Sequence, residues 1–574
     1  MKNYKLYKVP QISSVQDMLI KTVNKYGDKL AVEDIAVNPI SKASYKELLD
    51  YTLKFGNALK NLGLKERSHI AVIGENRLQW GIAYLTAMAF NYVVVPIDKN
   101  LNANEILNIL YESDSEAIVF TNDFENLLSE QKGIFKKLKF FISMDHLAHK
   151  GEFLSMKELI DSYPPENINN LPKINPDEMA EIIFTSGSLG RAKGVMLSQK
   201  NISSNLMDMV SALFIYPQDK FLSVLPMHHT YECTCGFLCP LYCGASVSFA
   251  RSLKTITDDI QRVKATVLLG VPLLFDKMFK RIYKSINEDK VKSKIIKPLI
   301  RITDITTKVG WNSSKKIVFS ELHNKFGGAV RLFIAGGAAP DPKTALGLRE
   351  FGFTFLQGYG LTETSPILAL NKLNLFKDNA AGIPLPNVDI KINNPDADGV
   401  GEIYAKGKNV MLGYYRNEAL TKEAFDDGWF KTGDLGCFDE EGFLHISGRK
   451  KNVIIANNGK NVFPEEIEDI LNRSPFIQEC MVYGEKDSKH DEIIAAQIFT
   501  DTEAFIEYSE KNSVNISQEL VHKLISDEVK KVNAELSSFK QIKKFYIREK
   551  EFEKTTTQKV KRYLVHNNQI ESQD

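Results

Sequence analysis

Between about residues 44 and 300, short apolar segments alternate with segments whose apolar residues recur at helical spacing. The runs His69–Ile73, Tyr92–Ile97 and Ala117–Thr121 have the length of buried strands, whereas Tyr45–Leu62 and Trp80–Phe90 have the pattern of helices. Buried strands that alternate with helices are typical of parallel sheets covered by helices on both faces. We therefore expect an α/β fold for this part of the chain.

The sequence changes character after about residue 380. Glu402–Ala405 and Phe443–Ile446 have the length and composition of short strands, and the polar run Gly448–Asn452 has the composition of a linker. Pro464–Leu471, with Pro at its start and acidic residues behind it, indicates a helix. We expect a large domain over residues 1–450, in which helix-covered, mostly parallel sheets are joined by a short β-rich subdomain. A small, mobile α+β domain is expected over residues 451–574.

Composition excludes several functional classes. The 574 residues are 43% hydrophobic and 25% charged, and the net charge of +1 gives no reason to expect a nucleic-acid partner. The first 20 residues lack the apolar run of a secretory signal, so a cytoplasmic protein is expected. Residues 276–325 are helical and Lys-rich, which is typical of a solvated surface. Oligomeric state does not follow from these features.

Four of the six cysteines, at 233, 235, 239 and 243, lie in the longest uncharged stretch, Cys233–Ala250. Their spacing matches no common zinc site, so small packing residues in a reducing compartment are favoured over a metal site. Gly and Pro interrupt the stretch, which predicts a buried segment rather than a membrane span. Peripheral contact with the inner face of a membrane is left open.

The segment Thr185–Gly194 follows the apolar run Ile182–Phe184 and combines glycines, hydroxyls and a lysine. Glycine lets the backbone approach an anion closely, hydroxyl and N–H groups donate hydrogen bonds, and lysine adds a positive charge. Ala192 and Gly194 stand where a Walker loop requires Gly and Ser or Thr. A phosphate-handling loop of another kind is predicted, although such a composition also suits a plain flexible connection.

Further segments combine small residues with polar or charged ones. Gly336–Pro340 follows the strand-like run Arg331–Ala335, and Gln357–Glu363 offers an aromatic ring, a hydroxyl and a carboxylate within a few residues. Thr432–Asp434 and the tail Lys554–Lys559 complete the set. Each segment alone has an ordinary interpretation as a turn or a solvated terminus.

In this order and spacing, the segments together resemble the adenylate-forming superfamily over residues 20–565. Its members include acyl-CoA synthetases, peptide-synthetase adenylation domains and firefly-type luciferases. The similarity is greatest to long-chain fatty acid–CoA ligases, through Leu225–Glu232, Thr432–Gly436 and Gly448–Val453. The resemblance implies ATP-dependent activation of a carboxylic acid through an acyl-adenylate, with ATP, Mg²⁺ and coenzyme A as the small molecules involved.

The resemblance also implies roles for individual residues. Binding of the ATP β- and γ-phosphates falls to Thr185, Ser186, Gly187, Ser188, Gly190 and Lys193, and the adenine site to Gly337, Ala338, Gln357, Gly358, Tyr359 and Gly360. Thr362 corresponds to an α-phosphate contact, Glu363 to the Mg²⁺ ligand, Asp434 to the ribose-binding carboxylate and Arg449 to an arginine near ribose and phosphate. His229 is expected beside the acyl carboxylate. Lys559 is expected to act in adenylation and Lys451 as the hinge between the domains.

Two departures from the usual pattern stand out. Leu189 and Ala192 replace a Thr and a Pro of the loop, and Gln558 replaces the Gly before the tail lysine. Neither change removes a charge, so activity is expected. The apolar runs Val271–Phe275 and Cys233–Leu238 are candidate walls for an alkyl chain, while an amino acid substrate is disfavoured. The acceptor could also be a different thiol, as in fatty acyl-AMP ligases or acyl–acyl-carrier-protein synthetases. A non-enzymatic ATP-binding regulator is a further alternative.

Overall fold

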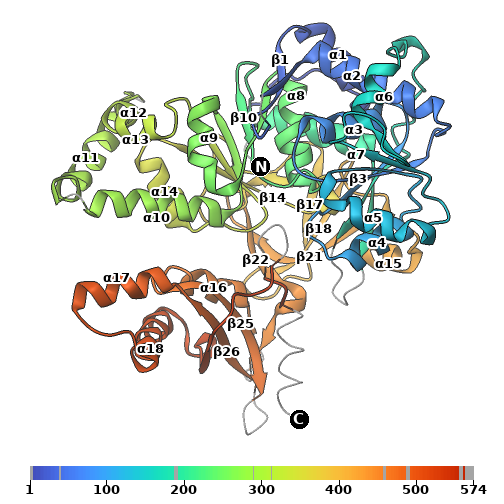
Figure 1. Cartoon of the computed structure of the whole chain (residues 1–574). Coiled ribbons are helices and arrows are strands. Elements are labelled where there is room, and N and C mark those ends of the chain that lie inside the picture. Colours follow the sequence, from blue (N-terminus) through green and yellow to red (C-terminus); the bar gives the residue numbers. More distant parts are fainter. Residues whose placement is uncertain are drawn as a thin grey trace. The chain divides into compact units, whose positions relative to one another are not determined.

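A computed structural model describes residues 4–37, 40–185, 192–288, 290–311, 313–456, 460–486, 492–554 and 560–562. Its elements are shown in Figure 1. The chain divides into two compact units. Unit 1 contains Met1–Ile390, Ala405–Phe430 and Glu440–Leu444, and unit 2 contains Lys391–Tyr404, Lys431–Asp439 and His445–Asp574.

Unit 1 contains a nine-stranded sheet in which the six strands from β14 to β1 run parallel. Antiparallel strands close it at both edges. Because the carboxyl ends of parallel strands lie at one edge of a sheet, the loops after β10, β12, β13 and β14 meet there. In sheet order the strands are β16 (Ile383–Pro384), β15 (Ile367–Leu370), β14 (Thr354–Gly360), β13 (Leu332–Ala335), β12 (Val267–Gly270), β10 (Lys220–Ser223), β11 (Ser246–Phe249), β1 (Leu30–Asp34) and β2 (Ser41–Ser44).

A second, eight-stranded sheet of unit 1 is parallel from β8 to β7 and ends in two antiparallel strands. Its hairpin of β8 and β9 pairs Thr185 with Lys193. In sheet order the strands are β19 (Gly413–Tyr414), β9 (Lys193–Ser198), β8 (Met179–Thr185), β4 (Val93–Ile97), β3 (His69–Ile73), β5 (Ala117–Phe120), β6 (Phe140–Ser143) and β7 (Phe153–Ser155).

Alternate side chains of the central strands enter different cores. Ile70 and Val72 of β3 pack in one cluster with α3, whereas Ala71 and Ile73 pack in another with α4. Because side chains alternate across a strand, this division means that helices cover both faces of the sheet. The predicted α/β class, with helix-covered and mostly parallel sheets, is confirmed.

Several helices of unit 1 begin with a capping side chain. Ser44 caps α2 in a capping box with Glu47, and Asn102 does the same for α4 with Glu105. The helices are α1 (Val15–Tyr26), α2 (Tyr45–Asn61), α3 (Leu78–Ala89), α4 (Ala103–Glu112), α5 (Glu125–Gln131), α6 (Met156–Ser162), α7 (Gln199–Ala212), α8 (Cys239–Cys243), α9 (Ile256–Val263), α10 (Pro272–Glu288), α11 (Lys290–Lys308), α12 (Ser314–Val318), α13 (Ser320–Lys325), α14 (Pro342–Glu350) and α15 (Glu418–Ala424).

The remaining strands form smaller sheets. A five-stranded sheet joins β17 (Val388–Asn393), β18 (Gly401–Gly407), β21 (Trp429–Phe438), β20 (Phe425–Asp426) and β22 (Leu444–Arg449). Unit 2 continues with the pair β23 (Ile454–Ile455) and β24 (Asn461–Val462) and with a sheet of β25 (Ile477–Lys486), β26 (Glu492–Thr500) and β27 (Lys544–Arg548). The helices α16 (Pro464–Leu471) and α18 (Gln518–Glu535) pack on its core, and α17 (Thr502–Asn512) follows β26. Among the described residues, no helix combines the length and apolar character that a membrane crossing requires.

Glu181 is an acidic residue on β8 in the interior of unit 1. It is 2% exposed, accepts a hydrogen bond of 3.3 Å from the Tyr84 hydroxyl, and burial raises its pKa to about 8. A carboxyl group with a raised pKa stabilises the fold while it is protonated, and this stabilisation is lost as the pH rises from the unfolded pKa toward 8.

We therefore predict that Glu181→Gln, which stays neutral and can still accept from Tyr84, gains stability relative to the wild type between pH 5 and pH 8. Each unit of pKa shift corresponds to about 1.4 kcal/mol, so the gain should reach a few kcal/mol. Urea unfolding of both proteins at the two pH values measures it. A difference in unfolding free energy that does not change with pH would contradict the prediction.

Candidate active site

Two glycine-containing turns lie at the carboxyl edge of the nine-stranded sheet. Gly336 follows β13, and a Cβ atom there would lie 2.7 Å from Cζ of the Tyr231 ring. Gly337 has φ +86°, a conformation that favours glycine. A Cβ at Gly360, at the end of β14, would lie 1.8 Å from the Pro366 carbonyl oxygen. These contacts leave no room for larger side chains at residues 336 and 360, so the backbone itself forms the surface.

The residues of the predicted adenine site lie along these two turns. Gly337 and Ala338 follow β13, while Gln357, Gly358, Tyr359 and Gly360 end β14. Gln357 is 6% exposed, and its side-chain amide donates to the Ala380 carbonyl oxygen. The Gln357 side chain therefore connects β14 to the segment at Ala380. Tyr359 is partly exposed, so its ring is the aromatic surface of this segment that a ligand could contact.

Lys193 and Glu363, predicted for phosphate and Mg²⁺, are linked through the side chain of Tyr414. The Lys193 Nζ atom lies 5.4 Å from the centroid of the Tyr414 ring, and the Tyr414 hydroxyl donates to Oε1 of Glu363 at 3.1 Å. The backbone supports this arrangement, because β19 pairs Tyr414 with Val195 of β9 and Met411 N–H donates to the Glu363 carbonyl oxygen at 2.8 Å. The phenol thus lies between an ammonium group and a carboxylate.

The sequence did not identify Tyr414, because its partners are far away along the chain. Glu363 lies in the short helical turn Thr362–Thr364 after β14, next to the predicted α-phosphate residue Thr362. A carboxylate is a ligand that Mg²⁺ accepts, and an oriented one beside a lysine fits a bound Mg²⁺–phosphate group. Of the predicted phosphate loop, Thr185 and Lys193 are described, whereas Ser186, Gly187, Ser188 and Gly190 lie outside the described residues.

His229, expected beside the acyl carboxylate, has two partners that the sequence did not point out. The rings of His228 and His229 are 4.0 Å apart between centroids, and Nε2 of His228 lies 3.5 Å from Oδ2 of Asp98, which follows β4. One ligand atom from each residue lies within 4.8 Å of the others, so this group could hold a cation. The four clustered cysteines, at 233, 235, 239 and 243, form no disulfide and are buried.

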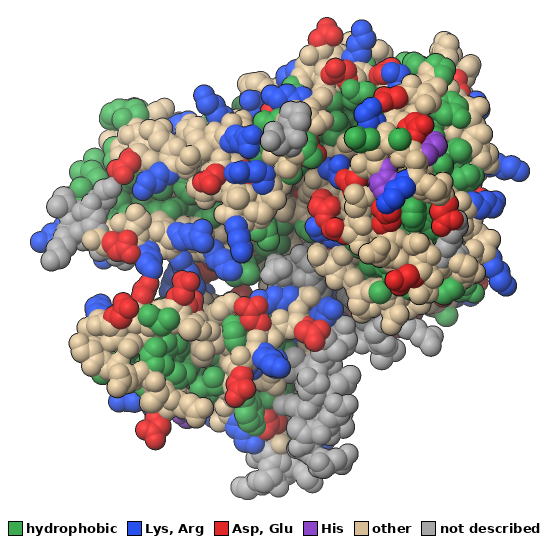
Figure 2. Space-filling view, in the orientation of Figure 1, with side chains coloured by type: hydrophobic (Ala, Val, Ile, Leu, Met, Phe, Trp, Pro, Cys, Tyr) green, Lys and Arg blue, Asp and Glu red, His purple; other side chains and the backbone are tan. Residues whose placement is uncertain are grey.

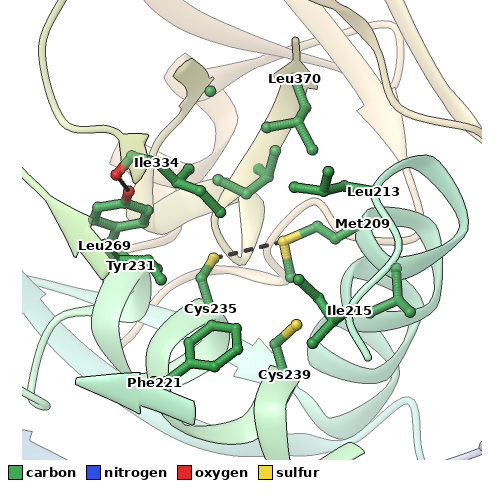
Figure 3. A pocket seen from close by; sticks show the side chains of 13 residues that line it. Met209, Leu213, Ile215, Phe221, Tyr231, Cys235, Cys239, Leu269, Ile334 and Leu370 are labelled. Carbon is green, nitrogen blue, oxygen red and sulfur yellow. Dashed lines mark hydrogen bonds between the residues drawn. The ribbon is translucent and has the colours of Figure 1, made fainter. Parts of the chain in front are cut away.

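An apolar cavity opens between α7, the segment 231–239 and the sheet (Figure 3). Its volume is about 40 Å³, so an alkyl chain could enter only if the lining side chains moved apart. Tyr231 donates from its hydroxyl to the Ile334 carbonyl oxygen at 3.0 Å. The cavity is lined by Met209, Val210, Leu213, Ile215, Phe221, Tyr231, Cys235, Cys239, Leu269, Ile334, Gly358, Ile367 and Leu370.

Only part of the predicted cavity wall is correct. Cys235 lines the cavity, where its Sγ atom lies 3.5 Å from Sδ of Met209. Phe275, from the other candidate wall, has no exposed surface and packs in the core between α10 and the sheet. Both candidate runs are apolar, and only the tertiary fold shows which of them contributes to the cavity.

Glu232 lies in a π-helical segment, Tyr231–Leu238, that the sequence did not predict. It is 1% exposed, and burial raises its pKa to about 8. At neutral pH this carboxyl group is therefore largely protonated. A neutral, buried acid offers no fixed charge to a substrate amino group.

In unit 2, Asp434 and Arg449 form an ion pair. Nε of Arg449 lies 2.7 Å from Oδ1 of Asp434, and the same guanidinium donates to the Thr432 carbonyl oxygen at 3.2 Å. Asp434 lies on β21 and is 5% exposed, whereas Arg449 ends β22 and is half-buried. The structure thus brings together the two residues predicted for the ribose.

Two more predicted residues, Lys451 and Lys559, belong to unit 2. Lys451 lies in the helical turn Lys450–Asn452, directly after β22, where its neighbour Lys450 pairs with Glu402 at 2.7 Å. Lys559 lies outside the described residues. Its role stays a prediction from the sequence.

Two family models match successive parts of the chain. A family model described as AMP-binding enzyme matches residues 19–415, and one described as AMP-binding enzyme C-terminal domain matches residues 451–571. The long-chain-fatty-acid–CoA ligase FadD15 of Mycobacterium tuberculosis is 30% identical over 88% of this chain and 87% of its own length. The human long-chain-fatty-acid–CoA ligase 1 is 30% identical over 78% of this chain and 68% of its own. The Arabidopsis thaliana long-chain-fatty-acid–[acyl-carrier-protein] ligase AEE15 is 26% identical over 91% and 81%.

Solved structures share the fold at lower identity. The anthranilate CoA ligase AuaEII in complex with anthranoyl-AMP has a TM-score of 0.78 at 18% identity and covers 98% of both chains. ATP-bound MatB from Rhodopseudomonas palustris has a TM-score of 0.76 at 24% identity and covers 97% of this chain and 98% of its own. These likenesses confirm the arrangement of the chain and leave its substrate undetermined.

The Tyr414 link gives a test of the site. We predict that Tyr414→Phe folds normally, keeps an aromatic ring under Lys193, and leaves Glu363 without its oriented donor. A hydrogen bond to a charged group contributes about 1.5–3 kcal/mol, so ATP–pyrophosphate exchange should fall about 10- to 100-fold.

Tyr415→Phe is the matched control, because the hydroxyl of Tyr415 lies 3.5 Å from Asp114 and not at Glu363. Equal activity in the two variants, whether both are retained or both are lost, would refute a specific role for the Tyr414 hydroxyl.

Proposed function

The chain belongs to the AMP-binding enzyme family, and from that premise we propose that it activates a long-chain fatty acid and transfers it to coenzyme A. One observation supports this proposal above the others. Strand β14 contributes Gly358 to the wall of the apolar cavity and leads within five residues to Glu363, which is linked through Tyr414 to Lys193. An apolar chain and a phosphate group could therefore be held side by side.

In the first step, an oxygen of the fatty acid carboxylate attacks the α-phosphorus of ATP, and the bond to the leaving pyrophosphate breaks. Two anions must approach, so neutralisation of charge and positioning dominate the catalysis. We assign Lys193 to the leaving pyrophosphate and Lys559 to the region where carboxylate and α-phosphate meet. His229 is assigned to the carboxylate. When bound, Mg²⁺ would be held by Glu363 and would offset the phosphate charge as a Lewis acid.

In the second step, the thiol of coenzyme A attacks the acyl carbonyl carbon and AMP leaves. A lysine that holds the phosphate would crowd the incoming thiol. We therefore propose that the C-terminal domain turns about Lys451 between the two steps. We further propose a cytoplasmic enzyme that contacts a membrane peripherally.

The alkyl chain is proposed to occupy the apolar cavity. Its lining of aliphatic, aromatic and sulfur-containing side chains offers nothing to a charged or polar acyl group. Burial of an alkyl chain there is favourable by about 0.8 kcal/mol per methylene, and this contribution favours long substrates.

A panel of acids from acetate to oleate, tested for AMP formation with coenzyme A, examines the proposal. We expect oleate to be preferred, and we expect Cys239→Phe, which fills part of the cavity, to lower kcat/KM for oleate at least tenfold while octanoate changes little. Cys243→Ala, a buried cysteine outside the cavity lining, serves as the control.

The outcomes separate the alternatives. Thiol-dependent AMP release with acyl carrier protein but not with coenzyme A would favour a carrier-protein ligase. The similar Arabidopsis enzyme carries that name. Acyl-AMP that accumulates with either acceptor would favour a fatty acyl-AMP ligase. ATP binding without any AMP formation would favour the regulatory alternative and overturn the proposal.

Lys559 is tested separately. We predict that Lys559→Ala lowers pyrophosphate exchange about a hundredfold or more, comparable to the removal of one donor from an oxyanion site. Lys561→Ala, two residues further along the same tail, should retain exchange. Near wild-type exchange in Lys559→Ala would show that the residue is wrongly assigned.

A further inference from the structure

Helix α11 of unit 1 carries an apolar stripe on its exposed side. Ile295, Ile302, Ile305 and Val309 follow each other at intervals of seven, three and four residues, and they are 46%, 55%, 63% and 79% exposed. Such intervals place all of them on one side of a helix. Trp311, 55% exposed, follows at the end of the stripe, and Ile317 of α12 is 58% exposed.

The stripe is not the core-facing side of α11. That side is formed by Ile300, which is buried, and by Ile296 and Leu299, which pack against the cluster containing Phe275 and Phe333. The helix is therefore apolar on two sides. One side packs in the core of unit 1, and the other is exposed. Grouped exposed hydrophobic residues of this kind mark an interaction surface.

Positive charge lies beside the stripe. Residues 290–318 contain eight Lys or Arg residues and one acidic residue, Asp304, in a chain whose net charge is +1. Lys294, Lys297, Arg301 and Lys308 are exposed on α11 itself. Asp304 is already paired with Lys315 at 2.7 Å, so it does little to offset the charge of the others. In Figure 2, hydrophobic side chains lie at the surface over α11 and α12, and Lys and Arg side chains lie nearby.

We propose that α11 and the segment up to α12 form a docking surface for an anionic lipid bilayer. Apolar side chains on one side of a helix, flanked by Lys and Arg, are the pattern of helices that lie in the membrane interface. Each Lys or Arg near an anionic surface adds about 1 kcal/mol of attraction, and Trp favours the headgroup level. For α11, this proposal goes beyond the expectation that residues 276–325 are a solvated surface.

The positive charge of this surface favours an anionic bilayer over a second copy of the chain as its partner. Two copies that met through this surface would bring eight Lys or Arg residues against eight others, with one Asp on each side. Like charges at an interface oppose association. An anionic bilayer supplies both the negative charge and the apolar layer.

Flotation of the full-length protein with vesicles tests the proposal. Vesicles of phosphatidylcholine alone are compared with an equal mixture of phosphatidylcholine and phosphatidylglycerol, without any fatty acid or nucleotide. We expect binding to the mixed vesicles and little to phosphatidylcholine alone, and we expect high salt to weaken it, because salt screens surface charges.

Two variants examine the two components of the surface. Lys297→Glu with Lys308→Glu, and separately Ile305→Asn with Val309→Asn, should each lower binding to the mixed vesicles about tenfold or more. The matched controls are Lys511→Glu with Lys523→Glu, both exposed, and Leu147→Asn with Ile506→Asn, 77% and 45% exposed. Pyrophosphate exchange in solution should be unchanged in all four variants, which confirms that they are folded.

Failure of the wild type to bind mixed vesicles would overturn the proposal, as would equal binding losses in the controls. Self-association in sedimentation velocity that disappears in the Ile305→Asn, Val309→Asn variant would also overturn it, in favour of a protein interface. These results are independent of the acyl substrate, so they leave the proposed reaction unaffected.

Discussion

The ring of Tyr414 keeps an ammonium group and a carboxylate near each other without letting them neutralise each other. Lys193 lies over the face of the ring and Glu363 accepts from its hydroxyl, so the phenol contacts both charged groups. A direct ion pair would use up both charges. The arrangement depends on three segments: the hairpin of β8 and β9, the short strand β19, and the turn after β14. The positions of the two large sheets in unit 1 are what bring these segments to one place.

The elements predicted from sequence are those whose burial is visible locally. The strand His69–Ile73 and the helix Pro464–Leu471 have the predicted bounds, because an unbroken apolar run and an N-terminal Pro mark them. Helix α3 begins at Leu78, two residues before the expected start, since its cap residue Arg77 gives no capping signal. Gly448–Asn452 was interpreted as a linker from its composition, yet β22 continues through Arg449 and places it on Asp434.

Within the site, residue types were predictable but their partners were not. The ion pair of Asp434 and Arg449 joins residues named in advance, while Tyr414, His228 and Asp98 were not named. Tyr414 contacts Lys193 and Glu363, and Asp98 contacts His228, across long stretches of sequence, and no local pattern encodes such contacts. The cavity has the same origin, since its lining comes from α7, the π-helical segment, α8 and five strands. The boundary expected near residue 450, the role of Lys559 and the hinge at Lys451 stay predictions.

The contact between Tyr231 and Gly336 has a mechanical consequence. The Tyr231 ring lines the apolar cavity and also contacts the main chain at Gly336. The contact is so close that a methyl group on Gly336 would not fit. The hydroxyl is anchored to the Ile334 carbonyl oxygen, which restrains the ring from swinging aside. A ligand that widens the apolar cavity at Tyr231 would therefore press on the turn that leads to Gly337 and Ala338. If the cavity holds the acyl chain and this turn holds the nucleotide, as proposed above, the Tyr231 ring would couple the two sites mechanically.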